Sequence, residues 1–160
     1  MSNGITSKGV ENGRAEFAYK CALSGKDIYN KKTEIDHEVF EDKNYKSYVK
    51  KIPMLIKTNG LGATFAYVKS KKAKDKENKK AGSKENCKNG YDLIYTQTSD
   101  WLISKGMITK ESELIAQLVS EKCSSSEYRR LTIETLALFN WLKRFADGLI
   151  EGEENESMEY

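Results

Sequence analysis

The feature that most constrains this 160-residue chain is a long apolar pattern near its C-terminus that repeats with the period of an α-helix. Successive apolar residues lie three or four positions apart, which places them on one face of a helix. Ser124 and Glu127 precede most of the pattern with the spacing of an N-terminal capping box. A helix of about 25 residues is therefore predicted. Its apolar stripe consists of Tyr128, Leu131, Thr135, Leu138, Phe139, Leu142, Phe145, Ala146 and Leu149.

A second amphipathic pattern begins at Tyr45 and also has helical spacing. Pro53 lies inside it and removes one backbone hydrogen bond, so a kink is expected there. Asn59 and Gly60 tolerate the left-handed conformation that commonly ends a helix. The segment 60–62 is accordingly expected to be a turn between two helices. The stripe of this helix consists of Tyr45, Tyr48, Val49, Ile52, Leu55 and Ile56.

Shorter helical patterns account for much of the remaining chain. Ser24 and Gly25 are expected to end or weaken the first, and Thr109 is a plausible N-cap for the segment that follows it. Thr33 and Asp36 resemble a weak capping box before a short helix over 35–40. The apolar faces are Ala15, Ala18, Tyr19 and Ala22; Leu61, Phe65 and Val68; Tyr91, Ile94, Tyr95, Thr98, Trp101 and Leu102; and Leu114, Ile115, Leu118 and Val119.

These patterns predict an all-α fold, a compact bundle of about five or six helices with no sheet. A single proline and the lack of alternating Val, Ile and Thr argue against strands. We expect one helical domain over 1–150, with a flexible lysine-rich loop near 69–88 and a frayed acidic tail over 151–160. The chain has neither an apolar run of about 20 residues nor the pattern of a secretory signal, so a cytoplasmic location is expected.

Positive charge is concentrated in the middle of the chain. Residues 43–88 contain 14 lysines against Asp75, Glu77 and Glu85, whereas the last ten residues contain five glutamates and no base. A local excess of this size attracts polyanions. Lysine runs also serve solubility alone, so composition by itself leaves both interpretations open.

Residues for catalysis are sparse. The single histidine, His37, lies among carboxylates on a short polar segment, where a solvated surface side chain is expected. Cys21, Cys87 and Cys123 lack the close pairing of a zinc site and are interpreted as reduced thiols. The sequence therefore predicts no catalytic residue, no metal site and no cofactor.

Two helices are predicted to carry basic faces. Opposite the apolar stripe of the helix at Tyr45 lie Lys43, Lys46, Lys50 and Lys57. On the last helix Arg129 and Arg130 are followed by Lys143 and Arg144, and Arg130 and Arg144 are separated by about 21 Å of helical rise. Trp141 points away from the apolar stripe, which indicates a protein contact.

Two blocks of this sequence carry a distinctive combination of motifs. The first contains Ile-Pro-Met-Leu-Ile-Lys-Thr-Asn-Gly-Leu over 52–61. The second contains Tyr-Arg-Arg-Leu-Thr-Ile-Glu from Tyr128 and Trp-Leu-Lys-Arg-Phe-Ala from Trp141, and Asp-Trp-Leu over 100–102 lies between the blocks. Together these motifs resemble the small-subunit family of the type III-B CRISPR, or Cmr, effector complex. Two features depart from the family pattern. The family often has leucine at the position of Ile52, and the lysine-rich loop of this chain is long.

The resemblance implies a non-catalytic subunit, present in more than one copy, that lies along the filament of backbone subunits beside guide RNA and target RNA in antiviral defence. Cleavage of the target would belong to other subunits of the complex. We expect contacts to RNA phosphates or to neighbouring subunits from Lys46, Lys50, Lys57, Arg129, Arg130, Lys143 and Arg144, and a protein interface at Trp141.

Two alternatives remain open at this level. The chain could be a helical protein-protein adaptor whose basic surface meets an acidic partner. A small nuclease using His37 and its neighbouring carboxylates is remote, because no residues are visible that would position them.

Overall fold

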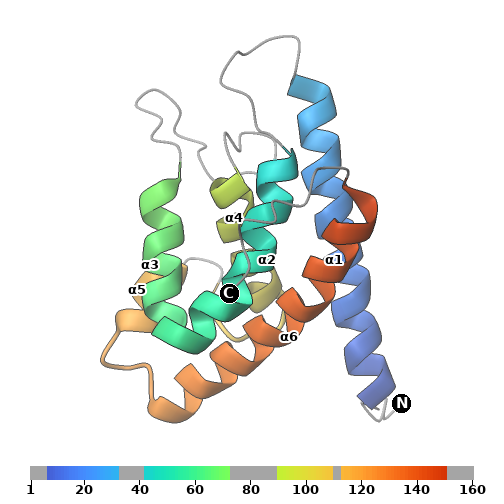
Figure 1. Cartoon of the computed structure of the whole chain (residues 1–160). Coiled ribbons are helices and arrows are strands. Elements are labelled where there is room, and N and C mark those ends of the chain that lie inside the picture. The colour runs from blue at the N-terminus through green and yellow to red at the C-terminus, as the bar shows by residue number, and fades with distance from the viewer. Residues whose placement is uncertain (1–6, 33–41, 73–89, 110–112, 151–160) are drawn as a thin grey trace.

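The computed structural model describes residues 7–32, 42–72, 90–109 and 113–150 (Figure 1). Within these ranges the chain forms six helices and no strand, which confirms the all-α prediction. The expected short helix over 35–40, His37, Cys87, most of the lysine-rich segment and the acidic tail lie outside the described residues. The helices are α1 (Ser7–Lys32), α2 (Asp42–Asn59), α3 (Leu61–Lys71), α4 (Gly90–Ser104), α5 (Leu114–Val119) and α6 (Ser125–Leu149).

The core surrounds α4, which packs against α1, α2, α3 and α6. Every residue from 91 to 98 is buried, so this helix is covered on all sides rather than on one face. The sequence pattern predicted only its apolar face, and that face is indeed buried. In Figure 1, α6 crosses in front of the bundle and packs most extensively against α1 and α2.

A buried polar network connects three of the helices. The Tyr45 hydroxyl on α2 donates a hydrogen bond to the side-chain oxygen of Gln97 on α4, at 2.6 Å. The Gln97 amide nitrogen donates to the backbone oxygen of Cys21 on α1, at 3.0 Å. Because unsatisfied buried polar groups are costly, this network fixes how α1, α2 and α4 fit together.

The predicted C-terminal end of α2 and the predicted start of α6 are confirmed. Gly60 has a φ of 90° and its N–H bonds the Ile56 oxygen at 2.8 Å, which ends α2 and leads directly into α3. Ser124 caps α6 by accepting a hydrogen bond from the Glu127 N–H at 3.1 Å. α2 continues through Pro53, and in Figure 1 its second half runs in a different direction from its first half.

Two details of the predicted helix boundaries are wrong. Ser24 and Gly25, which are expected to end or weaken the first helix, do not end it, because α1 continues to Lys32. Gly25 is buried directly against the ring of Tyr45, and the missing side chain permits this contact. Thr109 is not the N-cap of α5. That position belongs to Glu113, which makes no side-chain capping bond.

Candidate interaction surfaces

The arginines predicted as contacts lie on the solvent face of α6. Arg129, Arg130 and Arg144 are exposed, and none forms an ion pair with another described residue. Between them on the same helix lies Ile133, an apolar side chain that is 59% exposed. The solvent face of α6 thus carries positive charge near both ends and an exposed apolar residue in between.

The predicted lysines of α2 do not form one free stripe. Lys46 Nζ lies 3.5 Å from the Asp147 carboxylate and donates to the backbone oxygen of Ile150 at 3.2 Å. Its side chain is only 11% exposed, so most of it is covered by the end of α6. Lys50 Nζ lies 3.3 Å from the same carboxylate and is more exposed. The side chain of Lys43 is outside those that the structure describes.

Asp147 is held ionised by these two lysines. Partial burial would raise the pKa of its carboxyl, but the Lys50 hydrogen bond and the charges of Lys50 and Lys46 outweigh burial and lower that pKa. The shared carboxylate therefore offsets part of the positive charge that the sequence pattern assigned to α2.

The fold gathers the predicted cations at the two ends of α6. Lys57, in the last turn of α2, is exposed, and the adjoining turn meets α6 where the Gly62 N–H donates to the Tyr128 hydroxyl at 2.8 Å. This end of α6 also carries Arg129 and Arg130. At the other end lie Lys143 and Arg144 of α6, with Lys46 and Lys50 of α2 beside them; Lys143, like Lys46, is partly buried.

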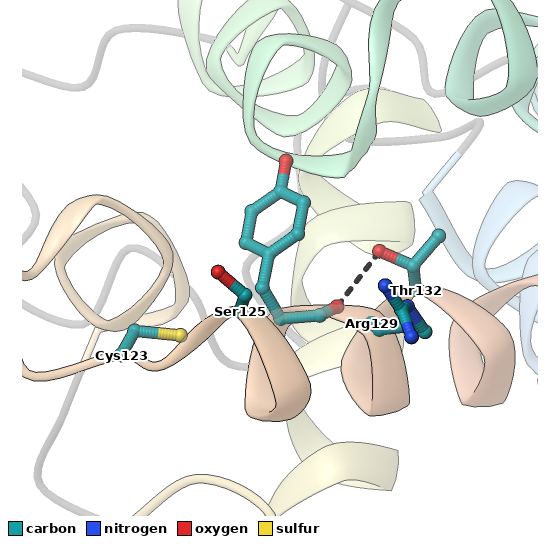
Figure 2. Close-up of a pocket in the computed structure, with 5 residues that line it drawn as sticks. Cys123, Ser125, Arg129 and Thr132 are labelled. Atoms are coloured by element: carbon teal, nitrogen blue, oxygen red, sulfur yellow. Dashed lines mark hydrogen bonds between the residues drawn. The ribbon is translucent and has the colours of Figure 1, made fainter.

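A surface hollow of about 430 Å³ lies beside the start of α6 (Figure 2). Its lining contains the Arg129 guanidinium and hydroxyl side chains, and Thr132 donates one hydrogen bond to the Tyr128 backbone oxygen at 2.8 Å. Burial, assisted by the charge of Glu127, raises the pKa of the Cys123 thiol, so this thiol is protonated at neutral pH. The lining residues are Cys123, Ser125, Tyr128, Arg129 and Thr132.

Trp141 belongs to a row of aromatic rings between α6 and α1. Its ring stacks on Phe145 with centroids 5.9 Å apart, and Phe145 meets Tyr19 edge-to-face at 5.5 Å. Trp141 and Phe145 are half-buried, whereas Tyr19 is 43% exposed. The row presents aromatic area to solvent, and the role of Trp141 as a protein contact stays a prediction.

The described residues contain no cluster of three or more His, Cys, Asp or Glu that could hold a metal ion. No helix among them is long and apolar enough to span a membrane. Among the described residues, the most buried ion pair joins Glu134 on α6 to Arg14 on α1. The indole nitrogen of Trp101 also donates a hydrogen bond to the Glu134 carboxylate. These bonds give Glu134 a structural role in joining helices.

A known protein family matches most of this chain. A family model described as CRISPR-associated protein (Cas_Cmr5) matches residues 10–149. The match runs from the first turn of α1 to the last residue of α6, and it includes both blocks of the sequence resemblance. The chain therefore belongs to the Cas_Cmr5 family of CRISPR-associated proteins, as the resemblance of its two motif blocks predicted.

Proposed function

We propose that this protein is the non-catalytic small subunit of a type III-B CRISPR RNA-guided RNA-silencing complex in the cytoplasm. It helps to form the filament and holds guide RNA and target RNA through their backbones, in antiviral defence. The observation that carries the proposal is the family match across the whole helical bundle, which indicates a Cmr complex subunit that associates with other CRISPR effector subunits.

The solvent face of α6 suits contacts to an RNA backbone. In RNA-guided complexes base pairing reads the sequence, and the protein recognises the backbone and the shape of the duplex. Arg130 and Arg144 lie 14 residues apart, about 21 Å along the helix, so together they reach phosphates several nucleotides apart. Their exposure leaves both guanidinium groups accessible to such a ligand.

Stacking of several copies requires two different complementary surfaces on each subunit, because a head-to-tail contact is what extends a filament. The aromatic row of Tyr19, Phe145 and Trp141 and the exposed Ile133 are apolar features suited to contact with a neighbouring subunit. We assign one such contact to the aromatic row.

The proposal is tested first in the cells that produce the protein. The tagged chain is purified at gentle salt, and the RNA that accompanies it is sequenced. Short RNAs with a common repeat-derived 5′ end are expected. Recovery of protein partners without such RNA would favour a helical adaptor instead.

A charge reversal on α6 tests the RNA surface directly. Changing Arg130 and Arg144 to Glu should lower RNA affinity at least roughly tenfold at low salt, because phosphate contacts are lost. The dependence of binding on salt should also become shallower, by about 0.7 in logarithmic slope per lost contact. Filter binding across a salt series measures both quantities.

Lys20→Glu is the matched control, because Lys20 is an exposed cation on α1 that pairs only locally with Glu16. It should leave both the affinity and the slope close to those of the wild type. Lys50→Glu is less informative alone, since it also breaks the contact with Asp147. Unchanged binding of the Arg130 and Arg144 variant at low salt would contradict this assignment.

A further inference from the structure

The residue that follows α6 is fixed in place, and the acidic tail over 151–160 begins directly after it. Ile150 has an extended backbone, and its N–H donates to the Ala146 oxygen at 3.0 Å. Its side chain is only 2% exposed, and its backbone oxygen accepts a hydrogen bond from Lys46 Nζ at 3.2 Å. The chain therefore leaves the helical bundle at a defined point, between the end of α6 and Lys46 of α2.

Cations surround this exit point. Lys50 Nζ lies 3.3 Å from the Asp147 carboxylate, which Lys46 also contacts. Lys143 and Arg144 come four and three positions before Asp147, which makes them its neighbours on the surface of α6. Neither of them forms an ion pair with another described residue. Four cations thus share one carboxylate, and we call Lys50, Lys143 and Arg144 the exit cluster.

The acidic tail has the opposite charge. Residues 151–160 contain five glutamates and no lysine, arginine or histidine. The five are Glu151, Glu153, Glu154, Glu156 and Glu159. They directly follow the C-terminus of a helix, where the free carbonyl groups repel negative charge. The tail is therefore stabilised by turning away from the helix axis and towards nearby cations.

The tail is also long enough to reach the exit cluster. Arg144 lies six residues before Ile150, about 9 Å back along the helix. An extended chain advances about 3.3 Å per residue, so the first four residues of the tail span about 13 Å. Glu153 and Glu154 therefore come within range of Arg144.

We propose that the acidic tail docks on the exit cluster of its own chain and competes there with an RNA backbone. Attachment at the cluster gives the tail a high effective concentration, so it needs no strong individual contact. Ion pairs between exposed side chains are weak, and RNA with its many phosphates can displace them. The competition rests on the proposed function, because Arg144 is one of the RNA contacts, whereas the docking itself does not require RNA.

The docking is tested without RNA, by zero-length carbodiimide cross-linking of the full chain at low salt. This reagent joins a carboxylate to a lysine amine where the two groups touch. Cross-links from the tail peptide to Lys143 or Lys50 are expected. Lys57 is the matched control, because it is an exposed lysine of α2 at the opposite end of α6, and it should give none.

A mixture of isotope-labelled and unlabelled chains shows whether the contact lies within one chain. Cross-linked peptides should carry a single isotope composition. Mixed pairs would show that the tail binds a neighbouring copy, and this would overturn docking within the chain. Cross-linking to Lys57 as often as to the exit cluster, or no cross-link from the tail, would also overturn it.

The competition is tested with a labelled oligouridylate of about 20 nucleotides, a length that covers more than one usual binding site. Changing all five tail glutamates to glutamine in the full chain should raise RNA affinity about three- to tenfold at low salt, because the exit cluster becomes available. The gain should shrink as salt rises, since exposed ion pairs are screened. An unchanged affinity at low salt would overturn the competition.

Repulsion at a distance between the tail and RNA would also raise the affinity, so the position of the cation has to decide. In an Arg144→Gln background the gain from the neutral tail should fall below about twofold, because the tail has lost a docking partner. Arg130→Gln is the matched control at the other end of α6, where the gain should keep its wild-type value. Equal gains in the two backgrounds would show general repulsion and overturn the docking.

The outcomes separate the docking from the proposed function. Tail cross-links to the exit cluster in a protein that binds no RNA at low salt would overturn the proposed RNA contacts, and with them the competition, but would leave the docking standing. RNA binding by the full chain, without tail cross-links and without a gain from the five substitutions, would overturn the docking and the competition and leave the proposed function standing.

Discussion

At the scale of the residue, two glycines of α1 differ in what surrounds them. A Cβ atom on Gly25 would lie 2.4 Å from Cε1 and 2.5 Å from Cδ1 of the Tyr45 ring. That ring is fully buried, and its hydroxyl is bonded to Gln97 at 2.6 Å, so it has no room to move away. A Cβ atom on Gly13 would meet only Lys105 Nζ, at 3.9 Å, the end of a flexible side chain.

The two glycines therefore predict opposite effects of the same substitution. Gly25→Ala should lower the free energy of unfolding by roughly 1–3 kcal/mol, because it overpacks the contact between α1 and α2. Gly13→Ala should raise it by about 0.5–1 kcal/mol, because alanine favours the helix more than glycine does. Urea unfolding followed by circular dichroism measures both, and equal effects at the two positions would contradict the close packing at Gly25.

At the scale of the element, Glu134 joins α6 to α1 and α4. Its two carboxylate oxygens accept hydrogen bonds from Arg14 Nε and Nη2, both at 2.8 Å. Trp101 Nε1 donates to the same carboxylate at 3.0 Å, and Lys105 lies over the Trp101 ring. The Arg14 hydrogen bonds hold the pKa of Glu134 below its usual value and outweigh the opposing effect of burial.

This lowered pKa makes the junction sensitive to acid. Because the unfolded chain binds the proton of Glu134 more readily than the folded protein does, the stabilisation is complete near neutral pH. It is lost as the pH falls below the ordinary pKa of 4.5 and through the folded value. Glu134→Gln should lower the free energy of unfolding by about 1–3 kcal/mol at pH 7. The difference in free energy of unfolding between this variant and the wild type should become smaller as the pH falls.

Urea unfolding of both proteins over a pH series measures this change. Glu16→Gln serves as the control, since Glu16 forms only an exposed pair with Lys20 on the same helix. That variant should match the wild type at every pH. If the loss of unfolding free energy in Glu134→Gln stays the same down to the lowest pH at which both proteins fold, the ionised carboxylate does not have the role given to it.

At the scale of the whole molecule, all six helices contribute to one hydrophobic core. Buried residues of each helix form a single connected cluster, and α4 lies at its centre. Such a core predicts one cooperative unfolding transition rather than separate transitions of parts. Backbone circular dichroism and tryptophan fluorescence, from Trp101 and Trp141, should report the same midpoint. Two midpoints would contradict the expected single helical domain.

Much of the fold could be predicted from local pattern. The stripes of α2 and α6 and the caps at Gly60 and Ser124 depend on residues within a few positions of one another, so the periodicity of the sequence suffices. The exposure of the α6 arginines follows from the same periodicity. The stacking of Tyr48 on Tyr91 and the edge-to-face contact of Tyr67 with Tyr91 could not be predicted, because the helical pattern treats Tyr48 and Tyr91 only as core residues and assigns no partner to Tyr67.

The sequence by itself thus determined the fold class, the extent of the strongly amphipathic helices and, through its two motif blocks, the family. Only the tertiary structure decided that α1 runs on through Gly25, that Gln97 is a core residue, and that Lys46 and Lys50 share Asp147. The physical reason is the range of the contacts. A helix stripe repeats within one or two turns, whereas each of these features depends on a partner from another helix, far away along the chain.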